Sequence, residues 1–246
     1  MTVVPPATRP FAWQTAGDVV WLEVPLDGAV AAFSTRLGGL REGPFRSLNL
    51  GILTEDDPQR VRINRERLLA AVGRLPDGLL MGRQVHGSSV QAREEADGEV
   101  RPGDGQLTRS PDLTPLVLVA DCVPVVLSGG GAVAVLHCGW RGVAAGILER
   151  AGEMMDVTSA ALGPGIGPCC YEVGDEVLEA LPEGATGPRR LDLALAIRAR
   201  LERLGIPPER IAETGLCTSC DSELFFSHRR DRGVTGRQAG LAWLSS

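Results

Sequence analysis

The stretch PLVLVADCVPVVLSGGGAVAVLHC, residues 115–138, decides the fold because it holds three apolar runs one after another. Asp121 and Cys122 separate the first run from the second, and three glycines at 129–131 separate the second from the third. Short apolar runs between such breaks are typical of strands that are buried on both faces. We therefore expect central strands here, with polar side chains presented at the strand ends.

The segments outward from this stretch predict further strands and helices. Residues 18–36 predict a hairpin with its tight turn at Asp27-Gly28. Residues 56–73 predict a helix, because Asp57 suits the N-cap, Pro58 the first helical position and Gly73 the end. Further helices are predicted over 143–156, 174–181 and 191–205. Residues 79–92 predict two short strands with a turn near His86-Gly87, and further strands are predicted over 159–163, 211–217, 224–228 and 237–244. Residues 95–108 predict a loop. Because strands and helices mix without strict alternation, we expect an α+β (mixed α/β) fold in a single domain, 1–246.

Composition excludes several classes of protein. The chain has 246 residues, a formal net charge of −6 and 25 basic residues, all of them arginine. Without lysine, neither Schiff-base catalysis nor a Walker-type phosphate lysine is available, so a phosphate site must use arginine or backbone N–H groups. The negative charge argues against a nucleic-acid partner. No apolar run approaches the roughly 20 residues of a membrane span, and no signal peptide is evident, so we expect a cytoplasmic protein.

The sequence has only three histidines, His86, His137 and His228; His86 stands at a predicted strand-turn junction and His137 at a predicted strand end. His86, Cys122 and His137 could form a zinc site, since three protein ligands leave a fourth position open for catalysis. Asp121 could then orient a ligand or take a proton. Two other interpretations use the same atoms: a hydrolase with Cys122 as nucleophile and His137 as base, or a copper centre. Each residue could also be an ordinary half-buried polar group.

Arginines and further cysteines form a second set of candidates. Arg141 falls at the start of a predicted helix, where free N–H groups favour an anion. Arg36 and Arg229 are additional candidates, although surface ion pairing also explains single arginines in so arginine-rich a chain. Cys217 and Cys220 have CxxC spacing, but no second CxxC or histidine pair accompanies them, so buried free thiols are favoured over structural zinc.

Several motifs together resemble the YfiH-type family, also called multicopper polyphenol oxidases or laccase-domain proteins. They are FSTRLGG (33–39), SLNLG (47–51), QVHG (84–87), ADCVPVVL (120–127), HCGWRG (137–142), GPGIGPCCYEV (163–173) and LFFSHRRD with TGRQ (224–238). One departure is Cys138, where the family more often has alanine. The resemblance implies a single-domain layered sandwich of mixed β-sheet with flanking helices. It also implies zinc bound by His86, Cys122 and His137.

The resemblance further implies an enzyme that phosphorolyses adenosine, inosine and S-methyl-5'-thioadenosine, and that deaminates adenosine. Its partners would be purine nucleosides and phosphate. Asp121 would manage protons, Arg36, Arg141 and Arg229 would bind phosphate or ribose, and Asn49 and His228 would contact substrate. Classical laccase chemistry is excluded by count, because three histidines cannot build a trinuclear copper cluster. Alternatives are a Cys–His hydrolase of peptidoglycan precursor peptides, a polyphenol oxidase (laccase-like) activity, and a metal-binding protein without enzymatic activity.

Overall fold

The three apolar runs of residues 115–138 form three strands, as the pattern predicts. They are β7 (Thr114–Val119), β8 (Val123–Gly129) and β9 (Ala132–Cys138), and β8 and β9 pair as an antiparallel hairpin. Every residue of β8 and β9 is buried. β7 lies in a different sheet from β8, so the chain crosses between sheets at Asp121-Cys122, where Asp121 has a positive φ of 92°.

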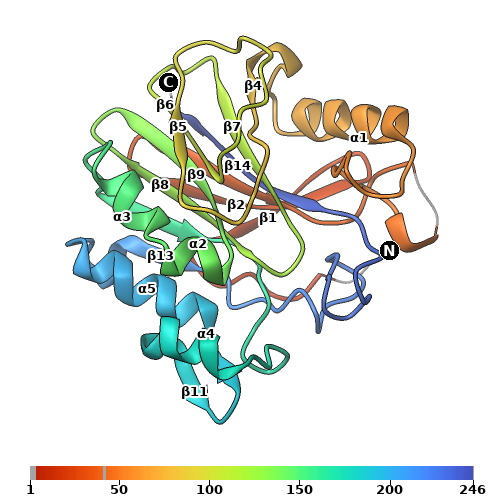
Figure 1. The fold of residues 1–246 in the computed structure, drawn as a ribbon. Helices are drawn as coiled ribbons and strands as arrows, with labels where there is room; N and C mark the ends of the chain where they lie inside the picture. Colours follow the sequence, from red (N-terminus) through yellow and green to blue (C-terminus); the bar gives the residue numbers. More distant parts are fainter. Residues whose placement is uncertain (1–3, 41–42, 246) are drawn as a thin grey trace.

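The computed structural model describes residues 4–40 and 43–245, and two six-stranded sheets dominate it (Figure 1). The first sheet has the order β1 (Ala12–Ala16), β2 (Val19–Leu26), β3 (Ala29–Ser34), β14 (Gln238–Leu244), β7, β4 (Leu79–Leu80). The second has the order β13 (Ile211–Glu213), β10 (Ser159–Leu162), β8, β9, β6 (Gly105–Thr108), β5 (Val90–Ala92). The pairs β4–β7, β5–β6 and β10–β13 are parallel and the other pairs are antiparallel, so both sheets are mixed.

Three apolar clusters divide the molecule into four layers. One cluster lies between the two sheets, and it includes Phe33 from β3 and Val135 from β9. A second joins the first sheet to α1 (Pro58–Ala71). The third joins the second sheet to the helices on its outer side, which are α2 (Trp140–Ala144), α3 (Ile147–Gly152), α4 (Asp175–Ala180) and α5 (Leu193–Arg203). The layered sandwich of mixed sheets with flanking helices is thus confirmed.

Alternation of side chains along the central strands decides which cluster each residue joins. In β9, Ala134, Leu136 and Cys138 pack toward the helices, whereas Val133 and Val135 face the other sheet. His137 has the parity of the second group, so it emerges at the end of the strand on the inter-sheet side. The neighbouring residues His137 and Cys138 therefore lie on opposite faces of the sheet, with the imidazole at the junction of the two sheets and the thiol in the core on the helix side.

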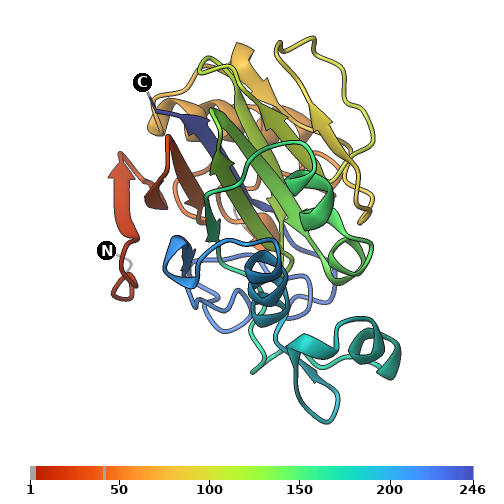
Figure 2. The ribbon, with the colours of Figure 1, turned by 90° about the vertical axis from the view of Figure 1, so that its left-hand side faces the viewer.

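The hairpin and the first helix match their predictions closely. β2 and β3 pair through a turn at Asp27-Gly28. Asp57 caps α1, because its side-chain oxygen accepts a hydrogen bond from the backbone N–H of Gln59 at 2.8 Å. The predicted helix over 191–205 is α5, and the small helix α4 lies beside the ribbon of β11 (Ala185–Gly187) and β12 (Arg190–Leu191), at one end of the sheets (Figures 1 and 2).

Three predictions of secondary structure were wrong. The expected helix over 143–156 is interrupted, because Gly146 takes a positive φ of 87° and separates α2 from α3. Residues 224–228 form no strand: Leu224 and His228 lie in turns, and residues 225–227 have no regular secondary structure. The loop expected over 95–108 ends in β6, where the side chains of residues 105–108 are all buried.

The prediction of one domain over 1–246 includes residues 1–3, 41, 42 and 246, which lie outside the described residues, and it stays a prediction. Among the described helices, none has the length and apolar character to cross a membrane.

Candidate metal centre and active site

His86, Cys122 and His137 come together where the central strands end. Their potential ligand atoms, one from each side chain, all lie within 4.8 Å of one another. The two imidazole rings meet edge to face, with centroids 4.8 Å apart and an interplanar angle of 78°. In tetrahedral zinc coordination, nitrogen and sulfur ligands lie roughly 3–4 Å apart, so small side-chain adjustments would close this set around one ion.

Asp104 organises this cluster, and no motif of the sequence marks it as a site residue. Its carboxylate is fully buried and accepts a hydrogen bond from Nδ1 of His137 at 2.8 Å. The same carboxylate accepts backbone N–H groups of Val85, His86 and Gly87 at 2.9–3.0 Å. A carboxylate on one ring nitrogen fixes the imidazole and leaves the other nitrogen for a metal. Asp104 therefore orients His137 and shapes the loop that carries His86.

The loop at residues 84–87 is held at both of its ends. The side chain of Gln84 exchanges two hydrogen bonds with the backbone of Leu118 in β7, at 2.7 and 2.8 Å. His86 then turns with a positive φ of 60°, which the hydrogen bonds to Asp104 support. Side-chain pairing thus replaces regular strand pairing here and exposes the imidazole of His86.

Cys122 and His137 shift each other's ionisation. Burial alone would raise the pKa of the Cys122 thiol, but the charge of His137 and hydrogen bonds from both histidines lower this pKa to about 6. Burial alone would lower the pKa of His137, but the charge of Cys122 and the hydrogen bond to Asp104 raise it to about 9. Without a metal, the pair is therefore a thiolate and an imidazolium at neutral pH.

The glycines of HCGWRG, residues 137–142, leave room for this cluster. A Cβ atom on Gly139 would lie 3.0 Å from Sγ of Cys122 and 3.3 Å from Cδ2 of His86. A Cβ atom on Gly142 would lie 2.8 Å from the carbonyl oxygen of Gly87. Cys138 stays apart in the helix-side core, where burial raises the pKa of its thiol.

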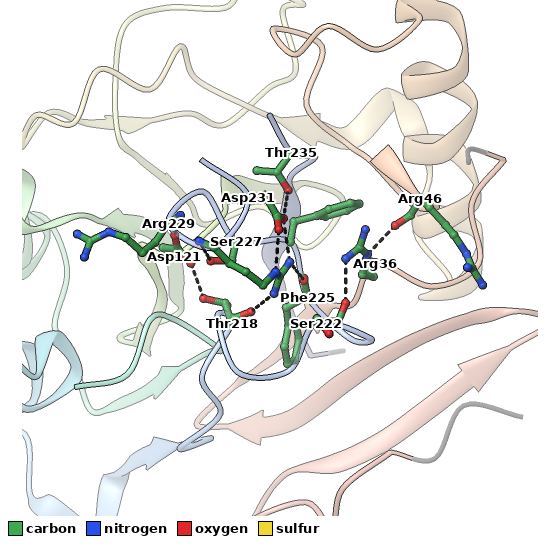
Figure 3. Close-up of polar contacts among 12 residues, drawn as sticks. Arg36, Arg46, Asp121, Thr218, Ser222, Phe225, Ser227, Arg229, Asp231 and Thr235 are labelled. Carbon is green, nitrogen blue, oxygen red and sulfur yellow. Dashed lines mark hydrogen bonds and ion pairs between the residues drawn. The ribbon is translucent and has the colours of Figure 1, made fainter. Parts of the chain in front are cut away.

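Asp121 lies next to Cys122 and links the crossover to two distant loops. One carboxylate oxygen accepts the hydroxyl of Thr218 at 2.7 Å, and the other accepts the backbone N–H of Arg229 at 2.6 Å (Figure 3). Its own carbonyl oxygen accepts the backbone N–H of Ile166 at 2.8 Å. Asp121 therefore positions the walls around Cys122 in addition to any part in proton transfer.

Two predicted arginines and the single tyrosine surround this junction. The exposed guanidinium of Arg141 stacks on Trp140, 4.4 Å from the ring centroid. Arg229 stacks on Tyr171 at 5.3 Å and donates to the carbonyl of Glu172 at 2.8 Å. Burial, followed by the charge of Cys122, raises the pKa of Tyr171 to about 12, while the charges of Arg229 and Arg141 act in the opposite direction. These groups thus share one electrostatic environment.

Arg36 and His228 are two further predicted substrate contacts. Arg36 donates to the carbonyl oxygens of Arg46 and Ser222 at 2.6 and 2.8 Å and stacks on Phe226. Figure 3 shows Arg36 on one side of Asp231 and Asp121 on the other. Burial and the charge of Arg230 lower the pKa of Arg36. His228 is exposed on the same segment that carries Arg229.

Asn49 is buried among polar partners, and its expected contact with substrate stays a prediction. It is fully buried, and its amide group donates to Thr54 and Asp56 at 2.9 and 3.0 Å. Its carbonyl oxygen accepts the backbone N–H groups of Gly51 and Arg237. Asn49 therefore positions Arg237. Burial lowers the pKa of Arg237, and the charges of Cys122 and Asp121 act in the opposite direction.

The sequence marks Arg237 only as part of the TGRQ motif, and the signal that could have identified it is an arginine directly before a buried strand.

A cleft of about 680 Å³ opens elsewhere, lined by residues such as Arg9, Asp27 and Arg198. It contains none of the predicted site residues, and we assign it no part in their chemistry.

Comparison with known proteins identifies relatives over nearly the whole chain. The family described as "Multi-copper polyphenol oxidoreductase laccase" matches residues 30–245. Purine nucleoside phosphorylase YlmD of Geobacillus stearothermophilus is 38% identical, covering 87% of this chain and 89% of that protein. Purine nucleoside phosphorylase YfiH of Escherichia coli is also 38% identical, covering 88% of this chain and 94% of that protein.

Solved structures share the fold. The crystal structure of YlmD from Geobacillus stearothermophilus has a TM-score of 0.87 at 35% identity, covering 96% of this chain and 100% of that chain. That of a Bacillus licheniformis protein named YfiH has a TM-score of 0.86 at 31% identity, covering 97% and 100%. The layered sandwich is therefore common to this chain and to these relatives.

Proposed function

The chain belongs to the multi-copper polyphenol oxidoreductase laccase family, and from this premise we propose that it is a purine nucleoside phosphorylase. The observation that carries the proposal is the convergence of His86, Cys122 and His137, with arginines around them, in a chain whose curated relatives bear that activity in their names. We propose adenosine, inosine and S-methyl-5'-thioadenosine as substrates, with deamination of adenosine as a second activity.

We propose zinc as the metal of His86, Cys122 and His137. Two imidazoles and a thiolate suit zinc, and three protein ligands leave one coordination position for water or substrate. Asp104 supports this assignment, because it occupies Nδ1 of His137 and leaves Nε2 available. When bound, zinc would supply a Lewis acid. The three histidines of the whole chain are too few for the copper cluster of a laccase.

The residues around the metal ligands divide into two proposed groups. Asp121 accepts one hydrogen bond on each carboxylate oxygen and keeps further acceptor capacity, so it can receive a proton beside Cys122. Arg141, Arg229 and Arg237 would hold the phosphate dianion, because guanidinium groups bind phosphate in bidentate fashion. Arg36 and His228 would contact the remaining part of the substrate.

A product assay tests this proposal. Adenosine is incubated with the purified protein, with and without inorganic phosphate, and the products are separated chromatographically. We expect adenine and ribose 1-phosphate only when phosphate is present, and inosine or hypoxanthine from deamination. Absence of any phosphate-dependent product across adenosine, inosine and S-methyl-5'-thioadenosine would refute the assignment.

The ion pair of Cys122 and His137 favours a second candidate, a cysteine hydrolase acting on peptidoglycan precursor peptides. A thiolate beside an imidazolium is the form in which cysteine acts as a nucleophile. The two candidates respond differently to reagents. Chelation should abolish a zinc-dependent phosphorylase and spare a hydrolase, whereas a hydrolase should release product from a precursor peptide without added phosphate.

A further inference from the structure

Four cysteines outside the candidate active site also converge. Cys169, Cys170, Cys217 and Cys220 place their sulfur atoms within 4.8 Å of one another. Sγ of Cys220 lies 3.5 Å from Sγ of Cys169 and 3.5 Å from Sγ of Cys170. All four are free thiols, and these separations far exceed the roughly 2.05 Å of a disulfide bond.

The parallel pairing of β10 with β13 brings the two cysteine pairs together. Parallel strands end at the same edge of a sheet, so the segments that follow them lie side by side. The pairing continues past the strands through a bridge between Gly165 and Cys217, and the backbone N–H of Thr218 donates to Gly165 at 2.9 Å. The CxxC pair thus meets an adjacent Cys-Cys pair that lies about fifty positions earlier.

The surroundings suit a thiolate cluster. Gly167 donates its backbone N–H to Sγ of Cys217 at 3.2 Å, and a Cβ atom there would lie 3.3–3.5 Å from Cys217 and from Sγ of Cys169. The guanidinium of Arg190 donates to the carbonyl oxygens of Pro168 and Cys169, at 3.2 and 2.7 Å, which holds the backbone that carries Cys169 and Cys170.

We propose that Cys169, Cys170, Cys217 and Cys220 form a second metal site, which binds one zinc ion through four thiolates. Zinc–sulfur bonds of about 2.3 Å in a tetrahedron place sulfur atoms about 3.8 Å apart, close to the separations found here. Binding releases the four thiol protons to solvent and forms four Zn–S bonds, with no change of oxidation state. With four protein ligands the site is closed, so its role is structural.

This second zinc would stiffen one wall of the candidate active site. Thr218 lies between Cys217 and Cys220 and donates its hydroxyl to Asp121, while Tyr171 directly follows Cys170. Arg230 donates to the carbonyl oxygen of Thr218 at 2.8 Å, which connects the same wall to the segment that carries Arg229. The zinc would therefore fix two loops that otherwise meet through a few backbone hydrogen bonds.

Metal analysis of the full-length protein tests the proposal independently of the enzymatic assignment. Protein is loaded with zinc, freed of excess metal and analysed for zinc per chain. The double variant H86A/C122A, which lacks two ligands of the other site, should retain one zinc. The Cys220→Ala variant should lose one zinc relative to the unchanged protein, while Cys138→Ala, which removes a buried thiol outside both clusters, should lose none. A metal-free H86A/C122A variant would overturn the proposal.

Thiol protection gives a second measurement on the unchanged protein, in case Cys220→Ala does not fold. With zinc bound, Cys169 and Cys220 should resist alkylation even though both are exposed, and a chelator should make these two cysteines reactive. Peptide mass spectrometry locates the modified residues. Rapid alkylation of Cys169 and Cys220 in the zinc-loaded protein, or a disulfide between the two pairs in freshly isolated protein, would overturn the proposal.

Discussion

The two ligand clusters of this protein differ in number, chemistry and support. The cluster of His86, Cys122 and His137 offers three ligand atoms at the junction of two sheets, and a buried carboxylate, Asp104, orients it. The other cluster offers four sulfur atoms on two loops at the edge of one sheet. Three ligands leave an open coordination position, whereas four thiolates close it. Ligand count and the supporting residues therefore distinguish the proposed reactive site from the proposed structural site.

The largest effect expected at the three-ligand cluster comes from Cys122→Ala. Loss of the only thiolate ligand should remove the metal of this cluster and lower kcat/KM by at least roughly 1,000-fold. Assays of zinc content and phosphorolysis measure both. The matched control is Cys138→Ala, which removes a thiol from the opposite side of the same strand ends and should retain metal and activity. Full activity in Cys122→Ala would show that the three-ligand cluster has no catalytic role.

The pH dependence of metal affinity at the three-ligand cluster should be steep. Metal binding requires a thiolate and a neutral imidazole, so between about pH 6 and pH 9 one proton must leave His137. Zinc affinity should therefore rise about tenfold per pH unit, or about 100-fold from pH 6.5 to pH 8.5. Competition titrations in the Cys220→Ala background isolate this cluster. A flat profile over this range would contradict the ion pair.

The same shifts affect the stability of the metal-free protein. The lowered pKa of Cys122 contributes stability at high pH, and this contribution is lost as pH falls through about 6. The raised pKa of His137 contributes stability at low pH, and this contribution is lost as pH rises through about 9. The ion pair is therefore intact between these two values, and alkylation of Cys122 in metal-free protein should show a midpoint near pH 6.

A smaller effect is expected from Asp104→Asn. The amide cannot accept all four hydrogen bonds that the carboxylate now receives, so the orientation of His137 and the loop of His86 both loosen. Loss of such a support typically lowers metal affinity by roughly 10–100-fold. Zinc competition measures this, and Glu99→Gln, on an exposed side chain of the same loop, is the control. Equal affinities in the two variants would argue against Asp104 as the supporting residue.

The smallest effect is expected from Gly139→Ala. The new methyl group would press on Sγ of Cys122 at 3.0 Å without backbone strain, since φ at Gly139 is −81°. We expect metal affinity to fall by up to about tenfold, at a free-energy cost of about 1 kcal/mol. Gly152→Ala in α3, where the nearest atoms are 3.7 Å away, should leave affinity unchanged. A larger loss in Gly152→Ala than in Gly139→Ala would contradict the steric argument.

The sequence predicted much of the fold and the centre of the three-ligand cluster. The continuous apolar runs and the breaks between them predicted the positions of β7, β8 and β9, and helix-capping residues predicted the position of α1. These are local properties, readable from neighbouring residues. The strand expected over 224–228 does not form, although Phe225 and Phe226 are fully buried, because the side chain of Gln238 rather than a neighbouring strand pairs with the backbone of Phe226.

The sequence shows which residue types are available: three histidines, no lysine, six cysteines and apolar runs that end in polar residues. Which of these residues come into contact depends on the three-dimensional fold. Asp104 reaches His137 through the pairing of β6 with β9, and Cys169 and Cys170 reach Cys217 and Cys220 through the pairing of β10 with β13. Strand pairing between distant segments brings these residues together, and their spacing along the chain does not predict that pairing. The partners of the CxxC pair, Cys169 and Cys170, could therefore be identified only from the fold.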